Sequence, residues 1–119
     1  MTDTTAPIVQ LSMRQLEAYN NNDIDAFCAC YHPEIVVLNA DGKPTTEGME
    51  AFRKAYGGLF ERFKVQATVT ERLVLGPHVV ERELWQRDER DGDLHQNGEV
   101  LVRYTLRDGL IGTAQFLFP

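Results

Sequence analysis

The stretch Glu71-Arg-Leu-Val-Leu-Gly-Pro-His-Val-Val-Glu-Arg82 decides the fold, because it predicts how two long strands are aligned. Gly76-Pro77 is a typical turn signal, and polar and apolar residues alternate on both sides of it. A loop of these two residues places an acid opposite a base on each face of the hairpin, which is favourable in antiparallel strands. The opposed pairs are Leu75 with His78, Val74 with Val79, Leu73 with Val80, Arg72 with Glu81, and Glu71 with Arg82.

One face of this hairpin is mainly apolar, so we expect it to be the inner wall of the sheet. Glu71 and Arg82 lie on that face and are expected to form an ion pair within a largely apolar wall. The pair has two interpretations. It is either a mutually satisfied structural bridge, or the polar anchor of a ligand pocket in which Arg82 engages a carboxylate or enolate oxygen. The same alternation places Trp85 on the outer face, where it fits a dimer interface.

Apolar residues at helical spacing precede the sheet, and period-two alternation follows them. Helices ahead of strands are typical of an α+β domain with helices on one face of an antiparallel sheet. A pair of glycines, Gly57 and Gly58, lies inside the last helix, where we expect a bend or close packing against the backbone. The expected helices are 8–21, 24–31 and 47–62, and the expected strands are 35–38 (buried on both faces), 64–75, 78–88, 97–107 and 110–118.

Arg107-Asp-Gly109 marks the last hairpin, and its loop length decides which residues face inward. A three-residue loop with glycine in the left-handed region places Val102 opposite Ala114 and Val100 opposite Phe116. A two-residue loop would instead turn Phe116 outward. We prefer the three-residue loop.

The composition fits one globular domain over residues 1–119, with 43% hydrophobic and 25% charged residues. The net charge of −6 and the lack of basic clusters argue against nucleic-acid and anionic-membrane partners. The longest apolar run, 26–31, is too short to cross a bilayer. Residues 1–7 have neither the basic start nor the apolar core of a secretion signal, so none is expected.

Residues that could bind metals or react as thiols are sparse. Cys28 and Cys30 point apart on a helix, so we expect two free thiols that fill the core and suit a reducing cytoplasm. No metal is expected, because His32, His78 and His95 lack metal-binding spacing. No cofactor is expected either, because the chain has no nucleotide-binding or nucleophile-elbow motif.

Four segments together resemble the nuclear transport factor 2-like superfamily, in its SnoaL-like and ketosteroid isomerase-like branch. The resemblance implies a cone-shaped (cystatin-like) fold, in which three N-terminal helices pack in the concavity of a curved, mainly antiparallel sheet. It also implies a homodimer. The segments are Asn22-Asp-Ile-Asp-Ala-Phe27, Tyr31-His-Pro-Glu-Ile-Val-Val37, Glu47-Gly-Met-Glu-Ala-Phe52 and Arg107-Asp-Gly-Leu-Ile111.

The catalytic residues of ketosteroid isomerases carry over only in part. Asn39 falls where their general base, an aspartate, lies, and an amide cannot take a proton from carbon at neutral pH. Gln15 lies near the position of their oxyanion-binding tyrosine. Val102, near that of their protonated aspartic acid, cannot donate a hydrogen bond. Tyr31 and Tyr56 resemble supporting tyrosines of that pocket.

The other branches carry over less well. Arg82 resembles the catalytic arginine of limonene-epoxide hydrolases, but their two aspartates fall at Leu84 and Phe116. SnoaL-like polyketide cyclases use an acid inside the cone, and Glu71 is the expected inner-face carboxylate.

These observations predict a cone that binds a small, largely apolar or weakly acidic molecule. Isomerase, cyclase or lyase chemistry on a carbonyl compound is open, and so is catalysis itself. The alternative is a non-catalytic dimerisation or binding module whose cone is filled by its own side chains. The expected pocket residues are Gln15, Tyr31, Asn39, Tyr56, Glu71, Arg82, Leu84, Val102, Tyr104, Phe116 and Phe118.

Overall fold

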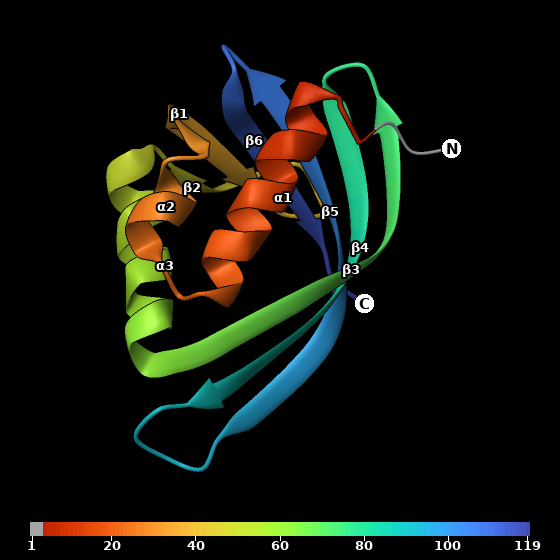
Figure 1. The fold of residues 1–119 in the computed structure, drawn as a ribbon. Helices are drawn as coiled ribbons and strands as arrows, with labels where there is room; N and C mark the ends of the chain where they lie inside the picture. The colour runs from red at the N-terminus through yellow and green to blue at the C-terminus, as the bar shows by residue number, and fades with distance from the viewer. Residues whose placement is uncertain (1–3) are drawn as a thin grey trace.

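Six strands form one curved, unclosed sheet, and three helices lie on its concave side (Figure 1). The computed structural model describes residues 4–119, so the first three residues of the expected signal-free start lie outside it. Strand order is β2-β1-β6-β5-β4-β3, antiparallel throughout except for the parallel pair β1–β6. The elements are α1 (Pro7–Asn20), α2 (Ile24–Cys28), β1 (Tyr31–Leu38), β2 (Pro44–Glu47), α3 (Met49–Arg62), β3 (Phe63–Leu75), β4 (His78–Glu89), β5 (His95–Arg107) and β6 (Leu110–Leu117). The predicted α+β cone is confirmed.

The first two helices begin as their sequences indicate. Pro7 occupies the first turn of α1, where its missing N–H costs nothing. The Asp23 side chain caps α2 by accepting a hydrogen bond from the Ala26 N–H, at 3.1 Å. However, α2 ends at Cys28 and not at Tyr31, because Tyr31 already begins β1. The structure also contains the edge strand β2, which sequence reasoning missed because Pro-Thr-Thr-Glu has no apolar alternation.

The third helix, α3, begins after Gly48, whose φ of 86° suits glycine alone. It runs uninterrupted through Gly57 and Gly58. An added Cβ on either glycine would meet no atom within 4 Å, so the expected close packing against the backbone is absent there.

The β3–β4 hairpin has the expected register up to the pair Glu71–Arg82, but a bulge follows. Thr70 is the extra residue, and beyond it Val69 pairs with Glu83. A bulge exchanges the two faces of a strand. The alternation that places every second residue of β3 on the inner face is therefore shifted by one residue at Thr70. On β4, which alternates regularly, the residues of the inner face are Val79, Glu81, Glu83, Trp85 and Arg87.

This bulge overturns the predicted directions of three residues, Glu71, Arg82 and Trp85. Glu71 and Arg82 lie on the outer face, with side chains 71% and 42% exposed, so the inward ion pair was a wrong prediction. The predicted outward position of Trp85 is wrong for the same reason, because its indole lines the interior of the cone.

The last hairpin has a two-residue loop and not the three-residue loop that we expected. Arg107 pairs with Leu110, while Asp108 and Gly109 both have positive φ (49° and 80°), as in a primed hairpin turn. A register shift at Gly112 then restores the alternation, so that Phe116 pairs with Val102 and stays on the inner face. The loop was predicted wrongly, whereas the inward faces of Ala114 and Phe116 are as expected.

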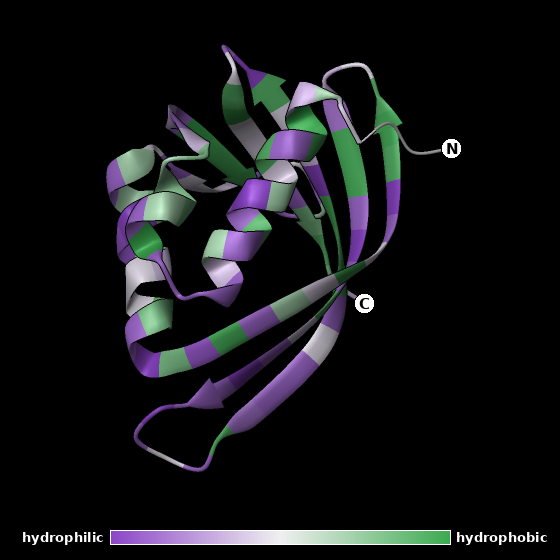
Figure 2. Cartoon of the chain, in the orientation of Figure 1, coloured by the Kyte–Doolittle hydropathy of each residue, from purple (hydrophilic) through white to green (hydrophobic). Residues whose placement is uncertain are grey.

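The core lies between the helices and the sheet and is rich in aromatic rings. Phe27 of α2 stacks on Phe52 of α3 with ring centroids 5.7 Å apart, and Tyr31 lies 4.5 Å from Phe52. Figure 2 shows apolar and polar bands alternating along β3, and a largely hydrophilic far end of the β4–β5 hairpin. Within residues 4–119, no helix has the length and apolar character needed to span a membrane.

Candidate functional site

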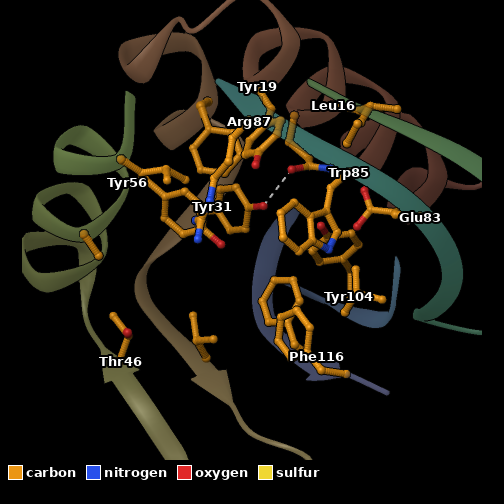
Figure 3. A pocket seen from close by; sticks show the side chains of 18 residues that line it. Leu16, Tyr19, Tyr31, Thr46, Tyr56, Glu83, Trp85, Arg87, Tyr104 and Phe116 are labelled. Carbon is orange, nitrogen blue, oxygen red and sulfur yellow. Dashed lines mark hydrogen bonds between the residues drawn. The ribbon is translucent and has the colours of Figure 1, made fainter. Parts of the chain in front are cut away.

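A cavity of about 490 Å³ opens between α1, α3 and the inner face of the sheet (Figure 3). This volume lies within the usual range of small-molecule sites. Its walls are largely aromatic and aliphatic, with a few polar side chains among them. The lining residues are Gln15, Leu16, Tyr19, Phe27, Tyr31, Val37, Thr46, Ala55, Tyr56, Leu59, Ala67, Glu83, Trp85, Arg87, Val100, Tyr104, Phe116 and Phe118.

Four tyrosines from different elements converge on this cavity: Tyr19, Tyr31, Tyr56 and Tyr104. The Tyr31 hydroxyl donates a hydrogen bond to Gln15 Oε1 at 2.9 Å, drawn as a dashed line in Figure 3. Burial raises the pKa of Tyr19 to about 12 and raises the pKa of the other three as well. The hydroxyls therefore stay protonated at neutral pH. Those of Tyr19 and Tyr56 can donate hydrogen bonds to an oxygen inside the cavity, whereas that of Tyr31 is already bonded to Gln15.

Glu83 is the acidic group of the cavity. Its exposed fraction is 7%, and no residue in the described range 4–119 donates a hydrogen bond to its carboxylate. Burial raises its pKa to about 7, with a further increase from the nearby charge of Glu81 and an opposing decrease from Arg72. The Glu83 charge also contributes to the raised pKa of all four tyrosines, which places their hydroxyls within its electrostatic reach.

Glu81, two residues earlier on the same face of β4, is fully buried but has partners. Both of its carboxylate oxygens accept from Ser12 Oγ of α1, each at 2.7 Å. Arg72 Nε donates to Glu81 Oε2 at 2.7 Å. The cluster Ser12–Glu81–Arg72 therefore joins α1 to the sheet, and it leaves Glu83 as the acid that can act on a ligand.

Trp85 and Arg87 continue the polar side of the cavity along β4. Trp85 Nε1 is buried and has no acceptor among the described residues. Its ring lies against Gly98 of β5, where an added Cβ would come 2.7 Å from Cζ2. The Arg87 guanidinium lies 5.4 Å from the Trp85 ring and 4.9 Å from the Phe63 ring, and its Nε donates to Gln96 at 2.7 Å. Over the described part of the chain, no group of three metal-ligating side chains is found.

Six of the expected pocket residues do line the cavity: Gln15, Tyr31, Tyr56, Tyr104, Phe116 and Phe118. Two others do not line it. Val102 is fully buried in the core. Asn39 lies in the β1–β2 turn, where its side-chain oxygen accepts from the N–H groups of Asp41 and Lys43, both at 3.0 Å.

The remaining three expected residues lie on the outer face of the sheet. Arg82 forms ion pairs there with Glu99, at 2.8 Å, and with Glu71, at 3.5 Å. Leu84 is 47% exposed. Of the two interpretations of the Glu71–Arg82 pair, the structure supports the structural one, as a bridge on the surface.

Sequence reasoning missed Glu83, Trp85 and Arg87. A signal for them exists, because they alternate along one strand with Val79 and Glu81. It went unused because a strand face carrying two acids and an arginine resembles a solvent-exposed face.

Most of this chain matches one protein-family model. Residues 13–112 match the family model described as "SnoaL-like domain". The chain belongs to the SnoaL-like domain family. This confirms the resemblance that the sequence motifs predicted. No curated protein matches this SnoaL-like chain.

Solved structures share the fold of this SnoaL-like domain at low sequence identity. An uncharacterised cystatin-fold protein from Novosphingobium aromaticivorans has a TM-score of 0.84 at 21% identity, covering 92% of this chain and 97% of its own. A Mycobacterium tuberculosis protein in complex with estradiol-17beta-hemisuccinate gives 0.84 at 15% identity, covering 95% and 94%. The Delta 5-3-ketosteroid isomerase from Mycobacterium sp. gives 0.83 at 17%, covering 95% and 93%. At these identities, the likeness establishes the fold alone.

Proposed function

We propose that this SnoaL-like domain binds a small, largely apolar carbonyl compound in the cone and that Glu83 exchanges a proton with it. One observation carries the proposal: a buried carboxyl group, without a hydrogen-bond donor among residues 4–119, lines an apolar cavity of about 490 Å³. Its pKa of about 7 is close to that of an efficient general base at neutral pH.

The chemistry that fits is proton transfer at the carbon beside a carbonyl group. The Glu83 carboxylate takes the proton, and the electron pair of the broken C–H bond forms an enolate. A tyrosine hydroxyl such as that of Tyr56 donates a hydrogen bond to the enolate oxygen. Return of the proton to another carbon completes an isomerisation. In a cyclisation, the enolate carbon attacks a second carbonyl carbon, and the proton passes from Glu83 to the alkoxide that forms there.

This assignment differs from that of the ketosteroid isomerases, because Asn39 and Val102 do not line the cavity. The neighbours support a ligand-binding cone: one is named a ketosteroid isomerase, and another was crystallised with a steroid ester. The alternative of a self-filled cone is disfavoured, because pockets of roughly 300 Å³ already hold small ligands.

The test follows deuterium exchange at the α-carbon of α-tetralone in D₂O by NMR. We expect the wild-type protein to accelerate exchange above buffer, and Glu83→Gln to slow it by about 100-fold, the usual contribution of a general base. Glu71→Gln is the matched control, because that carboxylate is exposed on the outer face. Equal rates for wild type and Glu83→Gln, or no acceleration by wild type, would reject the proposal.

We also propose that two copies pair through the outer face of the sheet. Leu84 of β4, Leu101 of β5 and Leu117 of β6 are 47%, 45% and 39% exposed there. The register places Leu101 directly opposite Leu117. Three large apolar side chains on adjacent strands form the kind of patch that a partner covers.

We infer a reducing compartment, the cytoplasm, from the two cysteines. Cys28 and Cys30 are both buried and unpaired. Burial raises the pKa of both thiols, which keeps them protonated and unreactive.

A further inference from the structure

The arginine at the end of the cavity indicates what the ligand must carry. We propose that Arg87 binds an acidic group of the ligand, so that the ligand class is a ring-containing hydrophobic carboxylic acid. This rests on the proposed function only in using the same cavity.

The guanidinium of Arg87 is held in place without a carboxylate partner. Two aromatic rings flank it, at 4.9 and 5.4 Å, and its one side-chain hydrogen bond among the described residues goes to the neutral amide oxygen of Gln96. Within residues 4–119, it forms no ion pair. Arg53, Arg62 and Arg82 on the surface each pair with an acid. Arg90 and Arg103 have no ion pair among the described residues either, but unlike Arg87 they do not line the cavity.

A half-buried cation in this position is suited to an anion. Removing a charge from water is costly unless another charge compensates it. The terminal N–H groups of a guanidinium match a carboxylate in geometry, and such bonds are about twice as strong as neutral ones. Since no carboxylate within residues 4–119 pairs with Arg87 and the guanidinium lines the cavity, the compensating charge is assigned to the ligand.

The strand sets the spacing between the two ends of the ligand. Glu83, Trp85 and Arg87 occupy alternate positions on one face of β4, and all three line the cavity (Figure 3). At about 3.3 Å per residue, the Cα atoms of Glu83 and Arg87 are about 13 Å apart. The Tyr19 hydroxyl lies within the electrostatic reach of both charges.

A ligand that spans these groups has its carbonyl end near Glu83 and its carboxylate near Arg87. Its body lies beside Trp85 and Tyr19 in the apolar part of the cavity. This length and surface suit a small fused-ring skeleton. The buried Trp85 Nε1, which has no acceptor among the described residues, offers a further donor to an oxygen of the ligand.

The experiment compares three probes that share one skeleton: α-tetralone, carboxy-α-tetralone with the acid on the aromatic ring, and the methyl ester of that acid. Affinities are measured by isothermal titration calorimetry at constant pH. We expect wild type to bind the acid at least 10-fold more tightly than the ester. Arg87→Met retains the apolar stem. It should weaken binding of the acid by about 10- to 100-fold and leave the affinity for the ester within about threefold of wild type.

Two controls separate binding of the acid from general damage. Arg82→Met removes a surface guanidinium and should leave all three affinities unchanged. Arg87→Lys keeps the positive charge and should retain part of the preference for the acid, with a melting curve close to wild type. Equal loss of acid and ester in Arg87→Met would mean that Arg87 only packs the wall, and it would overturn the inference.

The outcome is independent of the proton-transfer test. If the acid binds through Arg87 while Glu83→Gln exchanges deuterium as fast as wild type, the ligand class stands and the proposed chemistry fails. If the acid shows no saturable binding up to millimolar concentration while α-tetralone exchanges in a Glu83-dependent way, the chemistry stands and the ligand class fails.

Discussion

Two glutamates on one strand show how surroundings decide the role of a residue. Glu81 is fully buried, yet Ser12 and Arg72 satisfy its carboxylate at 2.7 Å. Glu83 lies one step along the same face without such a donor among the described residues, and its pKa is about 7. The first acid is part of the scaffold, and its charge helps to keep the second acid protonated near neutral pH.

The raised pKa of Glu83 makes stability depend on pH in a specific direction. Between its ordinary value of 4.5 and about 7, the folded state binds more protons than the unfolded state, so the free energy of unfolding falls as pH rises through this window. Glu83→Gln removes this dependence. We therefore expect the free energy of unfolding of the variant to exceed that of wild type by up to roughly 3 kcal/mol at pH values above about 7. Below about pH 4.5 the two should differ little.

Urea denaturation at a series of pH values measures this difference. Glu71→Gln serves as the control and should follow the wild-type profile, because its carboxylate is exposed. A Glu83→Gln curve parallel to that of wild type from pH 4.5 to above 7 would contradict the assigned environment of Glu83.

At the scale of elements, two irregular residues decide which side chains enter the cone. The helices and the strands other than β2 were predictable from apolar spacing, and so was the register at Gly76-Pro77. The bulge at Thr70 was not, because nothing in Thr68-Val-Thr70 distinguishes a bulged residue from a regular one. Since one extra residue exchanges the faces of a strand, the prediction chose the right pair of strands and the wrong acid, Glu71 in place of Glu83.

The site was more predictable where it depends on apolar residues. Tyr31, Tyr56, Tyr104 and Phe116 were assigned to the interior from periodicity and resemblance, and all four line the cavity. The register shift at Gly112 keeps Phe116 on the inner face, although the loop of the last hairpin was predicted wrongly. Charged residues inside a cone run against the usual pattern of burial, so the alternation of Glu83 and Arg87 with Val79 did not lead to their placement there.

The contact between β4 and β5 at Gly98 gives a prediction about these elements. A Cβ at this position would come 2.7 Å from Trp85 Cζ2, so Gly98→Ala must displace the indole. We expect a shift in tryptophan fluorescence and a loss of stability of about 1–3 kcal/mol, as for overpacked cores. The chain has a single tryptophan, so the fluorescence reports on this site alone.

Gly58→Ala is the matched control for that substitution. Gly58 lies inside α3 with nothing within 4 Å of an added Cβ. Alanine should therefore stabilise the helix by about 0.5–1 kcal/mol and leave the fluorescence unchanged. An unaltered spectrum and stability in Gly98→Ala would show that the indole does not rest on β5 as described.

For the whole molecule, the proposed pairing of two copies can be tested at the outer face of the sheet. Leu101→Glu introduces a charge into the patch of Leu84, Leu101 and Leu117 without touching the core, because Leu101 is 45% exposed. We expect analytical ultracentrifugation to show a dimer for wild type and a monomer for the variant. Met13→Glu, on the exposed side of α1, is the control that should stay dimeric. A wild-type monomer at micromolar concentration would refute the pairing.

The strand order also has a consequence for how the chain assembles. The ribbon of β1 and β2 joins the rest of the sheet only through β6, which pairs in parallel with β1 on one side and antiparallel with β5 on the other. Residues 110–117 therefore connect the two parts of the sheet, and they are synthesised after both of them. A ribosome that has not yet released this segment holds a molecule with two exposed edges and an open cone, so the ligand cavity is completed only when the last strand is in place.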